Sequence, residues 1–361
     1  MADPSETASE RSIDGSTRLS APAVNSGTMA VTVPERILEP YPRFSLYNSP
    51  YPAHDDASGI DLYPDSNAGI SPVAGVVRGV RTVGCPDREY AADRDYVIAI
   101  DVDRNWAAAV GIGGERPLIA RILHVDPDVE PGDRVVPGDV LGPMVRSGFF
   151  GPWVDNHVHL EFRDRDADPY RASGSRRLAA DAAVEPVSWD GTGTVVEAGP
   201  TYVRLDGPSR SGSNGPFRAL GSDQGVPLDG GLTHYAGGGA FLGDGFTPET
   251  WRNGDSAGSD GRTLSLLGQP IGTVDDRAGD GQEGCVEGGD GRTTAGWADV
   301  TWRDVDVYAN GERATGLSLF VTRRADLGIK VVKRGHDLSI GDRITVTIRS
   351  SNDPIRLGPG R

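Results

Sequence analysis

The sequence is very poor in cysteine. Cys85 and Cys285 are the only two among 361 residues, and they lie in different halves of the chain. No pair of closely spaced cysteines exists that could hold zinc or carry out dithiol chemistry. We therefore interpret the two as isolated buried thiols, with a disulfide between them left open as the alternative.

Lysine is almost absent as well. Lys330 and Lys333 are the only lysines among 36 basic residues, and the formal net charge is −16. This acidic, lysine-poor composition is typical of proteins from halophiles, because molar salt shortens the Debye length to about 3 Å and screens the self-repulsion. The same charge argues against a nucleic-acid partner and against binding to an anionic membrane.

No apolar run approaches the 18 residues or so that a membrane-spanning helix needs. Residues 1–28 are rich in Ser, Thr, Ala, Asp and Glu, and no basic segment followed by an apolar one marks a signal peptide. We expect residues 1–40 to be a disordered tail and lead-in, with order beginning near Tyr41. Met1 and Met29 both remain candidate starts, and a cytoplasmic location is predicted.

The chain is rich in turn formers, with 50 glycines and 26 prolines, which favours an all-β fold of short strands. The first domain is placed at residues 41–175 and a second β-rich region at 176–361. In the first domain, two Pro-Gly-Asp turns end at Asp133 and Asp139 and predict tight connections between short strands. The other strands expected there are 71–80, 95–102, 106–111 and 118–125.

Histidine carries the clearest signal. In residues 156–163, Val158, Leu160 and Phe162 alternate with His157, His159 and Glu161, as in a half-buried strand. The two histidines then share one face, roughly 6–7 Å apart at about 3.3 Å per residue. A surface strand that happens to carry two histidines is the alternative.

Several motifs follow one another in an order that identifies a family. They are His54, Gly59-Ile60-Asp61, Pro72-Val73-Ala74-Gly75, Leu123-His124, the two Pro-Gly-Asp turns, Ser147-Gly148 and His157-Val158-His159-Leu160-Glu161. Single pieces also occur in lipoyl-type domains and in the glucose-type phosphotransferase carrier. In this order they resemble the lysostaphin-type zinc metallopeptidases, which are peptidoglycan endopeptidases, over roughly residues 41–170. The acidic composition favours a haloarchaeal relative of that family.

The resemblance implies a duplicated hybrid motif, a β-barrel-sandwich peptidase-like domain, followed by the second β-rich domain. It also implies that His54, Asp61 and His159 ligate Zn²⁺, and that His124 and His157 are catalytic. Three protein ligands with an open fourth position are the usual arrangement of a catalytic zinc site. In the family three residues separate the first histidine from the aspartate, so residues 55–57 must loop out for His54 to reach the site.

Two functions are therefore weighed. The first is a zinc-dependent endopeptidase-like hydrolase acting on a peptide or peptide-like amide. The second is a catalytically silent member of the same fold that serves as a metal-binding or interaction module. No protein partner can be named from the sequence.

The C-terminal region, residues 176–361, shows no motif with catalytic chemistry. Hairpins are expected over 187–205 and between 305–312 and 315–321, the latter across the Asn310-Gly311 turn. The glycine-rich tract 287–292 lacks the ligand spacing of a calcium loop and is interpreted as a flexible loop.

Overall fold

The computed structural model describes residues 30–113, 116–209, 215–242, 263–275 and 296–358. The expectations for the tail 1–28, for Cys285 and for the tract 287–292 lie outside these residues. The expectation of a buried thiol is wrong for Cys85, which is a free cysteine and only half-buried. The described residues form 26 strands and three short helices, and the all-β prediction is confirmed. Within the described ranges, no helix is long and apolar enough to cross a membrane.

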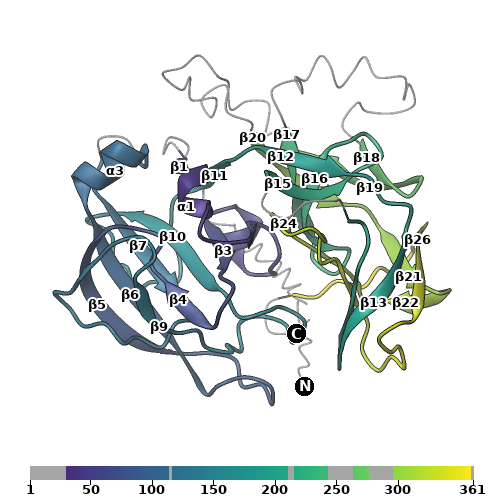
Figure 1. Ribbon diagram of the computed structural model, residues 1–361, viewed down its shortest axis with the longest axis horizontal. Helices are drawn as coiled ribbons and strands as arrows, with labels where there is room; N and C mark the ends of the chain where they lie inside the picture. The colour runs from purple at the N-terminus through teal and green to yellow at the C-terminus, as the bar shows by residue number, and fades with distance from the viewer. Residues whose placement is uncertain (1–29, 114–115, 210–214, 243–262, 276–295, 359–361) are drawn as a thin grey trace, which may run out of the picture.

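Two β-rich lobes lie side by side (Figure 1). We call residues 31–181 the N-terminal lobe. Its elements are β1 (Val31–Pro34), α1 (Glu35–Leu38), β2 (Arg43–Ser45), α2 (Pro52–Asp55), β3 (Gly59–Tyr63), β4 (Ala68–Ile70), β5 (Gly75–Gly84), β6 (Arg94–Val102), α3 (Arg104–Val110), β7 (Leu118–Leu123), β8 (Arg134–Val135), β9 (Val140–Pro143), β10 (Val158–Asp164) and β11 (Leu178–Asp181).

The main sheet of this lobe runs in the order β8-β5-β6-β7-β10-β3-β2, with every neighbouring pair antiparallel. β10 therefore lies between β7 and β3, so its side chains meet residues from both neighbours. The two Pro-Gly-Asp turns form as expected, with φ of 103° at Gly132 and 92° at Gly138. Asp133 and Asp139 each accept a hydrogen bond at 2.8 Å from the backbone N–H three residues earlier.

Two expectations for this lobe are wrong. Residues 104–110 form the helix α3 instead of a strand, because the Asp103 side chain caps it by accepting from Trp106 N at 2.8 Å and Gly111 ends it with φ of 83°. Order also begins before Tyr41. β1 pairs in parallel with β11 and buries Val31 and Val33 completely.

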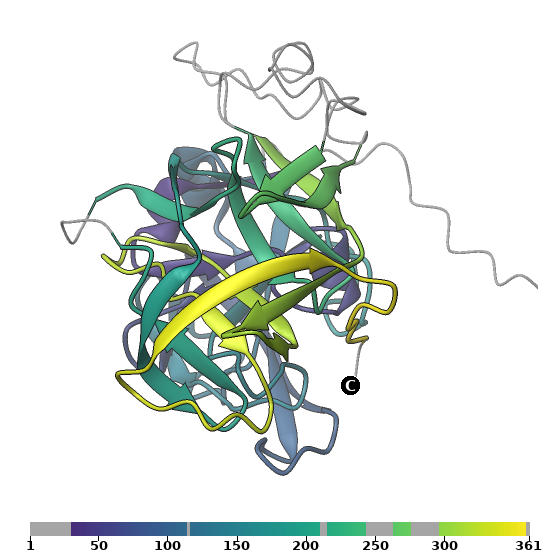
Figure 2. The same ribbon diagram turned by 90° about the vertical axis from the view of Figure 1, so that its right-hand side faces the viewer.

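We call residues 184–350 the C-terminal lobe. Its strands are β12 (Val184–Val187), β13 (Thr192–Gly199), β14 (Tyr202–Leu205), β15 (Phe217–Gly221), β16 (Pro227–Leu232), β17 (Gly237–Leu242), β18 (Thr263–Leu266), β19 (Gln269–Val274), β20 (Gly296–Trp302), β21 (Val305–Ala309), β22 (Glu312–Ala314), β23 (Gly316–Leu319), β24 (Val321–Thr322), β25 (Lys330–Val332) and β26 (Arg343–Ser350). In Figure 2 this lobe faces the viewer and β26 crosses its front.

The Asn310-Gly311 turn is present, with both residues at positive φ, but the hairpin is shorter than expected. β21 pairs with β22, whereas β23 pairs with β16 and β25. Gly316 has φ of 155°, which redirects the chain so that Leu317 and Leu319 enter the core of this lobe.

The lobes share both backbone and core. β2 pairs with β24, which joins the two sheets edge to edge. Phe217, Ala219 and Val321 of the C-terminal lobe belong to the same apolar cluster as the N-terminal core.

At this junction the fully buried Asp229 accepts hydrogen bonds from Ser45 Oγ at 2.7 Å, Leu46 N at 2.7 Å and Tyr47 N at 3.2 Å. Burial raises the pKa of Asp229 to about 7, although these donors act in the opposite direction.

Candidate metal centre

Three potential metal ligands meet where α2, β3 and β10 come together. His159 on β10 lies directly opposite Asp61 on β3 in the strand register. Asp61 Oδ1 is 2.8 Å from His159 Nδ1 and 3.4 Å from His54 Nε2. One ligand atom from each of the three residues lies within 4.8 Å of the others, and all three side chains are buried. The cluster could hold a metal ion.

His54 reaches the cluster although it lies earlier in the chain than the family spacing places it. Pro52–Asp55 form a single helical turn, and Ala57 follows with φ of 50°. Ser58 N then donates to Ala53 O at 2.7 Å, which closes the extra residues into a compact loop. The helical turn and the left-handed residue Ala57 thus accommodate the extra residues between His54 and Asp61.

The second ring nitrogens of both histidines are held by other groups. His54 Nδ1 is 2.6 Å from Leu46 O, and His159 Nε2 is 3.1 Å from Glu161 Oε1. Ligating histidines in metal sites are commonly oriented in this way by a carbonyl or a carboxylate. Two oriented imidazoles and one carboxylate are a donor set that fits a divalent transition-metal ion.

His157 borders the same point. Its Nε2 is 3.4 Å from Asp61 Oδ1, and its Nδ1 is 2.8 Å from Asp155 O. Burial lowers the pKa of His157 to about 3, which outweighs the nearby negative charge of Asp61, so its imidazole is neutral. His157 and His159 thus face the same carboxylate, in agreement with the alternation in the sequence.

His124 lies beside His157, with ring centroids 5.0 Å apart. It adopts the left-handed conformation, with φ of 68°. This conformation lets Asp95 bind it twice, at 3.1 Å from the backbone N and 2.6 Å from Nδ1. The Nε2 atom is thereby left as the group that can act within the site.

Sequence reasoning missed Asp95. Its carboxylate also accepts from Ser147 Oγ at 2.6 Å and from Tyr96 N at 2.7 Å. Burial acts to raise its pKa, but these donors and His124 together lower it to about 2. Asp95 lies beside His124 because of the antiparallel register of β6 against β7, and the sequence alone does not predict that register.

The sequence places Glu161 on the same strand face as the two histidines but indicates no role for it. It binds His159 and also pairs with Arg121 Nη1 at 2.5 Å and Arg163 Nη2 at 3.3 Å. Despite the opposing effect of burial, His159 and Arg121 lower its pKa to about 2. For His159, burial acts to lower the pKa, but the hydrogen bonds to Asp61 and Glu161 outweigh it and raise the pKa to about 9. The pKa of Asp61 lies well below its usual range, because the neighbouring histidines outweigh its desolvation.

The C-terminal lobe also touches the site. Lys330 on β25 is 1% exposed, and its Nζ donates to Trp153 O and Asp155 Oδ1, each at 2.7 Å. Arg43 Nη2 pairs with the other oxygen of Asp155 at 2.5 Å. Since Asp155 O accepts from His157, the C-terminal lobe supports the segment that orients this histidine.

Comparison with known families assigns both halves of the chain. Residues 32–180 match the domain of unknown function (DUF8155) N-terminal domain, and residues 185–349 match the DUF8155 C-terminal domain. The chain therefore carries both domains of this family, in that order. No curated protein and no solved structure gave a match.

Proposed function

We propose that the N-terminal lobe is a lysostaphin-type Zn²⁺ hydrolase that cleaves a peptide amide bond. We further propose that the protein is a haloarchaeal relative of that family and acts in the cytoplasm. The observation that carries the proposal is that His54, Asp61 and His159 each offer one ligand atom within 4.8 Å of the others. Two further imidazoles border this cluster in the order that the family resemblance implies. Two nitrogen donors and one carboxylate suit zinc, and three ligands leave one position open.

The roles follow from the hydrogen bonds. A zinc ion bound there would polarise the amide carbonyl and make water more acidic. His157, a neutral imidazole, would accept the proton of the attacking water at Nε2. His124, held at Nδ1 by Asp95, would donate from Nε2 to the oxygen that becomes negative in the transition state when both of its ring nitrogens carry a proton, and the Asp95 carboxylate would balance that positive charge.

Zinc stoichiometry measured by elemental analysis tests the metal site. We expect about one zinc per chain in wild type and near zero in His54→Ala and His159→Ala. His336→Ala is the matched control, because His336 bonds Gly199 O in the C-terminal lobe, away from the cluster. His157→Ala should keep zinc but lose hydrolysis of a panel of small peptide amides. Zinc retained in His54→Ala would remove His54 from the ligand set and weaken the enzyme proposal.

A silent module is the second candidate, and one observation favours it. Both ring nitrogens of His159 already have carboxylate partners, and the five site residues are only 1–5% exposed. Such a network needs no metal to satisfy its buried charges, since they are already paired with one another. Wild-type protein that binds no zinc would decide for this candidate.

A further inference from the structure

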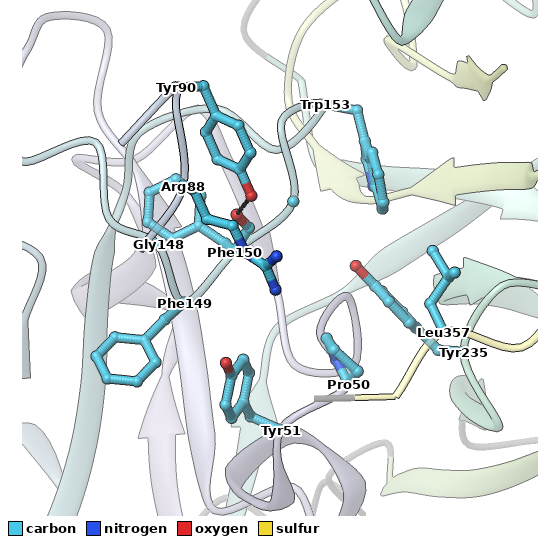
Figure 3. A pocket seen from close by; sticks show the side chains of 11 residues that line it. Pro50, Tyr51, Arg88, Tyr90, Gly148, Phe149, Phe150, Trp153, Tyr235 and Leu357 are labelled. Carbon is cyan, nitrogen blue, oxygen red and sulfur yellow. Dashed lines mark hydrogen bonds between the residues drawn. The ribbon is translucent and has the colours of Figure 1, made fainter. Parts of the chain in front are cut away.

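The candidate metal centre is closed in this structure. A cavity of about 20 Å³ lies against it, which is room for about one water molecule. Phe150 in the cavity wall packs on the histidines, with its ring centroid 4.6 Å from that of His157 and 5.2 Å from that of His124. A peptide amide can therefore reach these two imidazoles only if part of the wall moves. The aromatic side chains of that wall are Tyr51, Tyr90, Phe149, Phe150, Trp153 and Tyr235 (Figure 3).

A much larger groove adjoins this cavity. It has about 1120 Å³ of accessible space, and its walls come from both lobes, with Asn156 on one side and Thr201 and Tyr202 on the other. Two residues, Arg88 and Tyr90, belong to the lining of the groove and to the lining of the cavity. The tip of the β5–β6 loop, which carries both, therefore separates the open groove from the closed cavity.

The β5–β6 loop is fixed at two points below its tip. A Cβ atom at Gly148 would lie 1.9 Å from Pro86 O, so the backbone has no room to shift there. On the other side of the tip, Ala92 N donates to Arg146 O at 2.8 Å. Between these points lie residues 87–90, of which three are exposed to solvent. The tip can therefore move about two firm ends without disturbing the sheet.

Tyr90 connects this tip to the wall of the cavity. Its OH donates to Phe150 O at 3.0 Å, as the dashed line in Figure 3 shows. The Arg146 guanidinium lies 5.4 Å from the centroid of the Tyr90 ring. The ring is nevertheless 38% exposed, and it borders the groove. A ring that turned outward would enter this open space, where water can replace the hydrogen bond to Phe150.

From these observations we propose that residues 87–90 are a lid over the metal centre and that Tyr90 is its latch. When the latch is released, the cavity joins the groove, and a peptide lying in the groove gains access to His124 and His157. Closing again excludes water from the site. The admission of a peptide rests on the proposed function, whereas the control of access to the two histidines does not.

Modification of histidines by diethyl pyrocarbonate, mapped by mass spectrometry of the full-length protein, measures this access without requiring metal or hydrolysis. Tyr90→Phe removes the latch hydroxyl and keeps the ring. The modification rates of His124 and His157 should then rise about fivefold, the effect of losing one ordinary hydrogen bond from the closed state. Tyr90→Ala also removes the ring and should raise both rates further. Tyr308→Phe is the matched control, because Tyr308 on β21 lines neither the cavity nor the groove, and it should keep the wild-type rates.

The outcomes separate the lid from the proposed function. Wild-type rates at His124 and His157 in both Tyr90 variants would overturn the lid. An equal rise at His336 in the C-terminal lobe would indicate general loosening of the protein and would overturn it as well. Rates that change as expected, in a protein that hydrolyses no peptide amide when loaded with zinc, would reject the proposed function alone. Hydrolysis by wild type without any change of access in the variants would reject the lid alone.

Discussion

Gly59 determines where the His159 ring can lie. A Cβ atom at this position would meet His159 Cε1 at 2.5 Å and Nε2 at 2.8 Å. The imidazole therefore lies over the bare backbone of β3 at a position two residues before Asp61. The glycine that opens the Gly59-Ile60-Asp61 motif thus has a steric reason to be there.

Gly59→Ala should displace His159 and weaken zinc binding at least tenfold while every ligand is still present. The crowding should also lower the free energy of unfolding by about 1–3 kcal/mol. Gly84→Ala is the matched control, since a Cβ there has no neighbour within 4 Å. Zinc titration followed by thermal melting measures both effects, and wild-type affinity in Gly59→Ala would show that the ring has room to move.

The sequence predicts some residues of the site but not others. His54, Asp61 and His159 could be named because each lies inside a local motif. Asp95 and Glu161 could not be given roles, since their partners lie on neighbouring strands and depend on register. A carboxylate on another strand can orient a histidine although it is far from that histidine in the sequence, so no local motif reveals the pair.

Among the elements, β10 was the easiest to predict and α3 the hardest. The β10 segment alternates strictly, because one face packs into the core and the other forms the site. Trp106-Ala-Ala-Ala-Val110 is a short apolar run without a period, so a strand and a helix fit it equally well. Its cap at Asp103 decides the outcome. The strand expected over 315–321 is present as β23, but its pairing differs from the expectation, because β23 lies between β25 and the distant strand β16.

β25 supplies a lysine whose protonation should affect stability. Burial lowers the pKa of Lys330 to about 8, and Asp155 offsets only part of this effect. Between pH 8 and 9.5 the unfolded chain then holds the lysine proton more firmly than the folded protein does. Stability therefore rises with pH in this window through Lys330, by roughly 1–2 kcal/mol.

Urea unfolding at pH 7.5, 8.5 and 9.5 measures this contribution. Wild type should gain stability relative to Lys330→Met as the pH rises. Lys333→Met is the matched control, because Lys333 pairs with Glu312 and does not touch Asp155, so it should keep the wild-type dependence. The same pH dependence in wild type and Lys330→Met would show that protonation of Lys330 does not change the free energy of unfolding.

At the scale of the whole molecule, the C-terminal lobe holds two of the site histidines indirectly. Asp229 fixes the backbone N–H of Leu46, whose carbonyl accepts from His54. Lys330 fixes Asp155, whose carbonyl accepts from His157. The division near residue 175 drawn from the sequence separates two recognisable patterns, yet the shared core and the β2–β24 pairing join them physically.

Because the lobes share a sheet and a core, the charge of the whole chain acts on one folded unit. At a net charge of −16, repulsion between exposed carboxylates opposes folding at low salt. Raising KCl from 0.1 M to 1 M shortens the Debye length from about 10 Å to about 3 Å and should raise the melting temperature.

A variant of lower charge separates screening from other effects of salt. Asp93, Asp166 and Asp337 are exposed, and changing all three to lysine shifts the net charge by two units each, from −16 to −10. This variant should melt at a higher temperature than wild type in 0.1 M KCl and gain less from added salt. Differential scanning calorimetry of both proteins across the KCl series gives the comparison. If salt raises the melting temperature of both proteins equally, it acts by strengthening apolar burial and not by screening charge. The halophilic interpretation of the composition would then fail.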